Sequence, residues 1–148
     1  MLGPWFARAS LPLTTAFMKN VDEDRREVTE VATKLFARAR PRVVDARVQP
    51  GEGKPGNDSS PCGHTSSIFT RAGLLAESFP EKRTELGEFA HRAVWEGVYA
   101  GVHFPSDVVG GWMLAEPIVQ ELKTKTAFRA QVEKGRAAMK AFVAKPAP

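Results

Sequence analysis

Residues 102–114 read VHFPSDVVGGWML, and this stretch decides which fold we expect. Pro105 suits the first turn of a helix, where a missing amide hydrogen breaks no hydrogen bond. The apolar residues behind it recur at helical spacing: Val108, Val109, Trp112 and Val119. The pattern therefore predicts a helix from Ser106 to Leu122, with His103 just before its start and Asp107 in its first turn.

The same helical spacing recurs along most of the chain, and no segment alternates apolar and polar residues as a half-buried strand would. The other expected helices are Asn20 to about Arg40, His64–Ser78, Thr84 to about Val102, and Thr126–Val143. We therefore expect an all-α fold, a single bundle of about five helices.

The first of these helices has clear end signals. Asn20 is expected to cap it, because acidic residues crowd the turn that follows and basic residues crowd the last turn. Its apolar stripe is Val28, Val31, Ala32 and Leu35. The helix should end at Arg40, since the residue before Pro41 is pushed out of the helical region.

Residues 46–63, ARVQPGEGKPGNDSSPCG, are expected to form a long loop. Glycine, proline, asparagine, aspartate and serine dominate this segment, and they do not support a regular element. Long ordered loops inside compact domains are often functional, which favours an active-site loop. A disordered linker is the alternative that the composition leaves open.

The composition fits one domain over residues 1–148, with 43% hydrophobic and 26% charged residues. Val108–Leu114, the longest strongly apolar stretch, is far too short to span a bilayer, so we expect a soluble protein. The N-terminal residues MLGPWFARASLPLTT do not form a signal peptide, although an export signal outside this sequence stays open. Cys62 is the single cysteine, which excludes an intrachain disulfide.

The net charge of +4 does not indicate a nucleic-acid-binding protein, because basic residues stand beside acidic ones, as in DEDRRE. No metal site is expected, since histidine, cysteine and carboxylates do not cluster at ligand spacing. A cysteine-dependent phosphatase loop is excluded too, because Ile68 occupies the position where its arginine would stand after Cys62. We therefore expect neither a metal nor another cofactor.

Residues 61–67, PCGHTSS, look like the start of a helix, with Pro61 and Gly63 marking the turn. Free amides at such a start carry partial positive charge and form an anion site. His64 at this place could donate a proton to a leaving group. A helix cap that merely contains a histidine is the alternative.

His103 lies four residues before Asp107, so the carboxylate can reach back to one imidazole nitrogen. That contact would fix the tautomer and leave the other nitrogen free as a nucleophile. Arg40 beside the long loop is a natural bidentate partner for phosphate. The alternative for Asp107 is an acid that only favours the first turn of the helix, with no role for His103. The alternative for Arg40 is a cation that only stabilises the end of a helix.

Taken together and in this order, ARARP, PCGHTSS and GVHFPSD resemble the motifs of the type 2 phosphatidic acid phosphatase superfamily. More narrowly, they resemble its soluble bacterial branch, the class A non-specific acid phosphatases, and the superfamily also contains vanadium haloperoxidases. The resemblance covers about residues 31–122, and LGPWF and AFRAQVEKGRA also look like that branch. Because the chain is shorter than typical members, N-terminal helices are expected to be absent from it.

Carried over position by position, the resemblance implies a role for each motif residue. His103 would attack phosphorus and form a phosphohistidine, and Asp107 would orient it. His64 would protonate the leaving oxygen, while Arg40 and the Gly63 amide would hold phosphate oxygens. The implied ligand is a small phosphorylated substrate or inorganic phosphate, and the implied location is periplasmic or secreted. The oligomeric state stays open, a homo-oligomer included.

The chain also departs from the family pattern at three positions. Thr33 stands in the slot of the phosphate-binding lysine, and Lys34, a weak substitute, is turned roughly 100° around the helix. Cys62 replaces a serine, and its thiol is a weaker donor than a hydroxyl. Gly97, next to Glu96, replaces the second arginine. Losing one fixed donor typically lowers the rate about 100- to 1000-fold.

These departures leave three functions open. The first is a phosphatase that hydrolyses small phosphomonoesters through His103, with impaired activity. The second is a degenerate family member that keeps the fold and a weak anion pocket but turns nothing over. The third, a vanadate-dependent peroxidase, is less favoured because that chemistry also depends on the missing cations. Lys34 or Arg38 would have to reach across the pocket to replace them.

Overall fold

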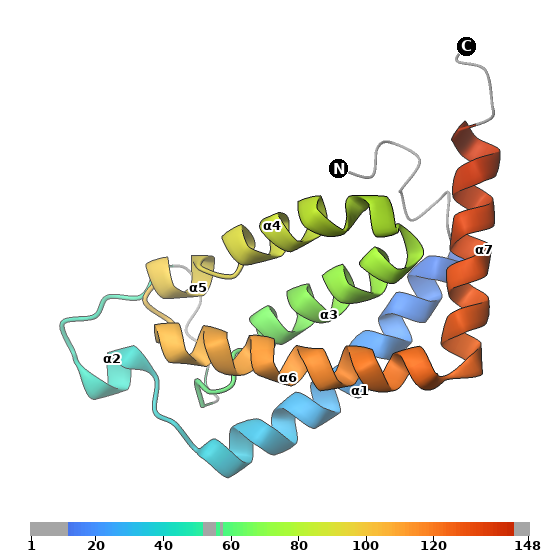
Figure 1. Ribbon diagram of the computed structural model, residues 1–148. Coiled ribbons are helices and arrows are strands. Elements are labelled where there is room, and N and C mark those ends of the chain that lie inside the picture. The colour runs from blue at the N-terminus through green and yellow to red at the C-terminus, as the bar shows by residue number, and fades with distance from the viewer. Residues whose placement is uncertain (1–11, 52–55, 57, 144–148) are drawn as a thin grey trace.

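The computed structural model describes residues 12–51, 56 and 58–143, and this part of the chain is helical without a strand (Figure 1). Five helices have eleven residues or more: α1 (Pro12–Phe36), α3 (Gly63–Ser78), α4 (Arg83–Ala93), α6 (Pro105–Thr124) and α7 (Thr126–Val143). Shorter elements join them: α2 (Pro41–Val44), the 3-10 turn η1 (Pro80–Lys82) and α5 (Glu96–Tyr99). The prediction of an all-α bundle of about five helices is confirmed.

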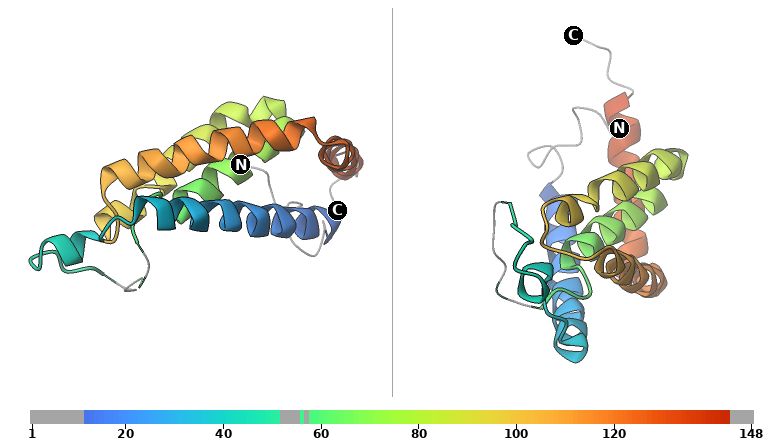
Figure 2. Two further views of the ribbon diagram at one scale, coloured as in Figure 1. Left: turned by 90° about the horizontal axis from the view of Figure 1, so that it is seen from below. Right: turned by 90° about the vertical axis from the view of Figure 1, so that its left-hand side faces the viewer.

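Helix α3 occupies the centre of the bundle, with α1, α4 and α6 packed against it (Figures 1 and 2). Helix α7 crosses one end of this group at a steep angle (Figure 1). The starts of α3 and α6 lie at the opposite end, together with α2 and α5. No helix in the described part of the chain has the length and apolar character that crossing a membrane requires.

The apolar core lies toward the end of the bundle where α7 packs. One cluster joins α1, α3, α6 and α7: Val21, Leu74, Val119, Phe128 and Val132. A second cluster joins the end of α3 to α4: Ala76, Phe79 and Leu86. Near the other end the buried residues are largely polar, with Ser59, Thr65 and Asp107 completely covered. Buried polar residues away from the main core are typical of a functional site rather than of packing.

Helices α3 and α6 pack tightly against each other at Gly111. A Cβ atom placed on this glycine would lie 2.8 Å from Cβ of Thr65 and would also overlap the carbonyl oxygen of Cys62. The amide of Cys62 in turn donates to the carbonyl of Asp107 at 2.9 Å. The start of α3 is therefore packed directly on the backbone of α6, because residue 111 has no side chain.

Three sequence-based boundaries are wrong. Asn20 lies inside α1, which starts at Pro12, so it caps nothing. Helix α1 ends at Phe36, because Ala37 adopts a positive φ of 44° and the chain runs on without helix to Arg40. The expected single helix from Thr84 to Val102 is interrupted after Ala93 and resumes only as the four residues of α5.

The apolar stripe expected for α1 does not face the core. Val28, Val31 and Leu35 are 44%, 69% and 81% exposed. The buried face consists instead of Val21, Arg25, Thr29 and Thr33, at four-residue intervals. Hydrophobic spacing identified the helix, but the neighbouring α3 determines which face is covered.

Candidate functional site

Arg40 is held almost fully buried at the start of α2. It precedes Pro41, which favours the extended backbone observed there, with φ −72° and ψ 156°. Its Nη1 donates to the carbonyl of Val102 at 2.8 Å, and its Nη2 donates to the carbonyl of Asp58 at 3.2 Å. The guanidinium therefore joins the long loop to the segment before α6. Burial lowers the pKa of Arg40 from its ordinary value, but an arginine stays protonated in proteins.

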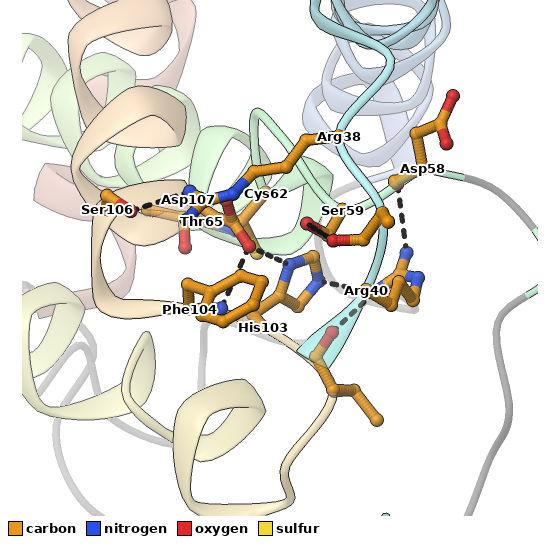
Figure 3. A network of polar contacts seen from close by, with 12 residues as sticks. Arg38, Arg40, Asp58, Ser59, Cys62, Thr65, His103, Phe104, Ser106 and Asp107 are labelled. Carbon is orange, nitrogen blue, oxygen red and sulfur yellow. Dashed lines mark hydrogen bonds and ion pairs between the residues drawn. The ribbon is translucent and has the colours of Figure 1, made fainter. Parts of the chain in front are cut away.

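The ring of His103 lies between Arg40 and Asp107 (Figure 3). Nη1 of Arg40 lies 3.3 Å from Nε2 of His103, and Nδ1 lies 3.5 Å from Oδ2 of Asp107. A guanidinium can only donate, so Nε2 accepts and the imidazole proton belongs on Nδ1, facing the carboxylate. The 3.5 Å separation is longer than a hydrogen bond, and Nδ1 is buried without one. Nε2 is therefore the ring nitrogen that carries the lone pair, and in this structure that lone pair accepts from Arg40.

Asp107 is completely buried and is held from two further directions. Its Oδ2 accepts from the amide of Phe104 at 2.8 Å, which closes the first turn of α6. Its Oδ1 accepts from Nη1 of Arg38 at 2.7 Å. The same nitrogen reaches Oγ of Ser106 at 2.6 Å, and the guanidinium lies 4.2 Å from the centre of the Phe104 ring. Arg38 is thus committed to Asp107 and does not replace a missing phosphate-binding cation.

Cys62 caps α3 and lies beside the His103 ring (Figure 3). Its Sγ accepts from the amide of Thr65 at 3.5 Å. Burial acts to raise the pKa of the Cys62 thiol, but contact with His103 and Thr65 outweighs it and lowers the pKa. Burial also acts to lower the pKa of His103, and Arg40 adds to this, but the sulfur of Cys62 and the charge of Asp107 raise it overall. The sulfur of Cys62 and the carboxylate of Asp107 therefore stabilise positive charge on the His103 ring.

One pocket of about 310 Å³ brings the two histidines together. His64, exposed at the start of α3, and His103 both line it, as do Arg40 and Gly63. The amides of the first two residues of α3 have no partner within the helix. Two imidazoles, a guanidinium and a helix start thus surround a volume of the size that a small phosphate ester needs.

Helix α1 forms another wall of this pocket, which the sequence did not suggest. Its lining residues are Arg25, Arg26, Thr29, Glu30 and Thr33. Thr33, in the expected lysine slot, does face the pocket, whereas Lys34 is exposed and does not line it. The four-residue interval from Arg25 to Thr29 and Thr33 is a signal of a shared helix face, but the apolar stripe had predicted a different buried face.

Gly97 lies directly against the His103 ring. A Cβ atom at this position would be 3.1 Å from Cδ2 of His103, and the carbonyl of Gly97 accepts from the amide of His103 at 3.0 Å. The imidazole therefore occupies the space beside residue 97, and Glu96 is exposed. Among the described residues, no three histidine, cysteine or acidic side chains lie close enough to hold a metal ion.

A model of a known protein family matches this chain. The model of the PAP2 superfamily matches residues 13–123, which is most of the chain and starts well before the expected residue 31. All the pocket-lining residues lie within this range. No curated protein matches the chain.

Proposed function

Because this chain belongs to the PAP2 superfamily, whose membership suggests phosphatase-type activity, we propose that it hydrolyses small phosphomonoesters through a phosphohistidine on His103. The observation that carries the proposal is the shared pocket of His103, His64 and Arg40, with Asp107 behind the nucleophile. The order of these residues along the chain supports the class A acid phosphatase branch, and with it a periplasmic or secreted location.

In the first step, the lone pair on Nε2 of His103 forms a bond to phosphorus, and the bond from phosphorus to the ester oxygen breaks. His64 gives a proton to that leaving oxygen. As positive charge develops on the ring, the proton on Nδ1 is attracted to Oδ2 of Asp107. The distance of 3.5 Å between Nδ1 and Oδ2 can then shorten to that of a hydrogen bond. Water then attacks phosphorus, returns a proton to His64 and releases inorganic phosphate from His103.

Arg40 is placed to position the phosphoryl group. It lies 3.3 Å from the attacking nitrogen, so a phosphate oxygen bound to its guanidinium puts phosphorus within reach of Nε2. Phosphoryl transfer depends mainly on positioning and on charge stabilisation of the equatorial oxygens. The amides of Gly63 and His64, at the start of α3, supply further donors.

A second candidate function is binding of an anion without turnover. Thr33 faces the pocket without a charge, and the ring of His103 fills the space beside Gly97. Two cations of the family pattern are therefore absent from their usual positions. Such losses lower the rate steeply while leaving a pocket that still accepts phosphate.

The test is hydrolysis of a chromogenic aryl phosphate from acidic to neutral pH. We expect turnover that vanadate inhibits, that His103→Ala abolishes and that His64→Ala reduces. Acid quenching after brief incubation with labelled substrate should trap label on the wild-type protein and none on His103→Ala. Turnover that persists in His103→Ala would contradict the proposed nucleophile. Phosphate binding without any turnover or trapped label would establish the second candidate.

A further inference from the structure

Arg25 is an unusual member of the pocket wall, because it is charged and only 6% exposed. Its Nε donates to Oδ1 of Asp22 at 3.0 Å. Its Nη1 donates to Oγ1 of Thr29 and to the carbonyl of Gly63, each at 3.2 Å. Within the described part of the chain, its Nη2 makes no hydrogen bond or ion pair. The residue thus has one donating group left over, in a pocket.

The contact with Gly63 fixes where that group lies. Gly63 is the first residue of α3, so the guanidinium sits beside the helix start that carries the unpaired amides. Arg25 belongs to the same face of α1 as Thr33, two turns earlier and about 12 Å away along the axis. Its Nη1 reaches Thr29, which is halfway along this distance. A cation therefore stands near the phosphate site although Thr33 carries none.

We propose that Arg25 is a phosphate-binding residue of this pocket. Its free Nη2 group holds one oxygen of a phosphate or phosphomonoester, while Arg40 holds another. The proposal rests on the proposed function, since it concerns the same pocket. Arg25 supplies from α1 the positive charge that the family pattern would place at Thr33.

Acidic residues near Arg25 offset much of the positive charge of the pocket, so phosphate binding there has to depend on the geometry of the hydrogen bonds. Asp22 pairs with Arg25 but does not line the pocket, whereas Glu30 and Asp58 line it together with three arginines, Arg25, Arg26 and Arg40. The net positive charge of the pocket is therefore small. Charge-assisted hydrogen bonds from fixed guanidinium groups still recognise phosphate oxygens under these conditions, because they depend on geometry as well as on charge.

The alternative is that Arg25 only ties α1 to α3. Arg71 provides a matched control, because its Nη2 also pairs with Asp22, at 3.2 Å, but it does not line the pocket. Removing Arg71 thus disturbs the same carboxylate without touching the site. Arg25→Lys keeps the charge but loses the fork of donors, and it serves as a second variant should Arg25→Gln fail to fold.

The experiment is calorimetric titration of each folded variant with inorganic phosphate, together with its thermal unfolding. Arg25→Gln should bind phosphate about tenfold or more weakly than the wild type, Arg25→Lys should fall between them, and Arg71→Gln should stay within about twofold. Equal phosphate affinity in the wild type and in Arg25→Gln or Arg25→Lys would overturn the proposal and leave the proposed function intact. A wild-type protein that binds no phosphate would overturn both.

Discussion

Replacing Arg38 with methionine tests the contact that holds Asp107. The carboxylate is completely buried, whereas the Arg38 side chain is 38% exposed, with 2.7 Å between Nη1 and Oδ1. Breaking a fully buried ion pair costs about 3–5 kcal/mol, because the remaining charge is left without a partner. Water can partly replace an exposed guanidinium, and the Phe104 amide still donates to Asp107. We therefore expect Arg38→Met to lower the free energy of unfolding by about 1–3 kcal/mol. Methionine keeps the aliphatic part of the side chain but removes the guanidinium that lies over the Phe104 ring.

The assay is urea unfolding monitored by far-ultraviolet circular dichroism, with thermal unfolding alongside. In a domain of this size, about 1 kcal/mol corresponds to a shift of about 2–4 °C in the melting temperature. Arg47→Met is the control, because Arg47 pairs with Asp45 at the same 2.7 Å while its own side chain is 91% exposed. Such a surface pair should contribute little that can be measured. Equal unfolding curves for the two variants would refute the reasoning that Arg38 is the partner of a buried charge.

Two further predictions concern His103. Gly97→Arg would restore the family pattern, but its Cβ meets the imidazole at 3.1 Å. We therefore expect it to lower the free energy of unfolding by about 1–3 kcal/mol and not to raise the turnover of aryl phosphate. A variant of unchanged stability and faster turnover would contradict this. The pKa of His103 is raised in the folded protein, so protonation of its ring stabilises the fold. This contribution is complete at a pH below the ordinary pKa of 6.5, and it is lost as the pH rises through the pKa of the folded state. The difference in unfolding free energy between the wild type and His103→Gln should therefore shrink from about pH 5.5 to about pH 8.5, and a difference that grows over this range would show that the sign is wrong.

The sequence predicted the helix starts that carry the site, because their signals are local. Pro105, and Pro61 with Gly63, lie within a few residues of the helix starts that they mark, and α3 and α6 begin within one residue of the expected positions. The motif order then suggested that His64, His103 and Arg40 share a pocket. These inferences needed no knowledge of how the helices pack.

The partners across the bundle could not be predicted in this way. Arg38 and Asp107 are 69 residues apart, and no local pattern connects them. The covered face of α1 depends on what α3 presents to it, so Arg25 is buried by its contact with Gly63 while Leu35 stays exposed. The spacing of apolar residues describes one helix at a time, whereas burial depends on how two helices pack against each other.

The missing side chain at Gly111 has a consequence for how this protein tolerates change. Because the turns that bear the two histidines rest on each other through main-chain atoms, their separation does not depend on the volume of any core residue. Substitutions around Phe79 or Phe128 can loosen the distant apolar clusters without resizing the pocket. A single methyl group at residue 111 would instead push the two turns apart and widen the gap that one phosphorus atom has to bridge.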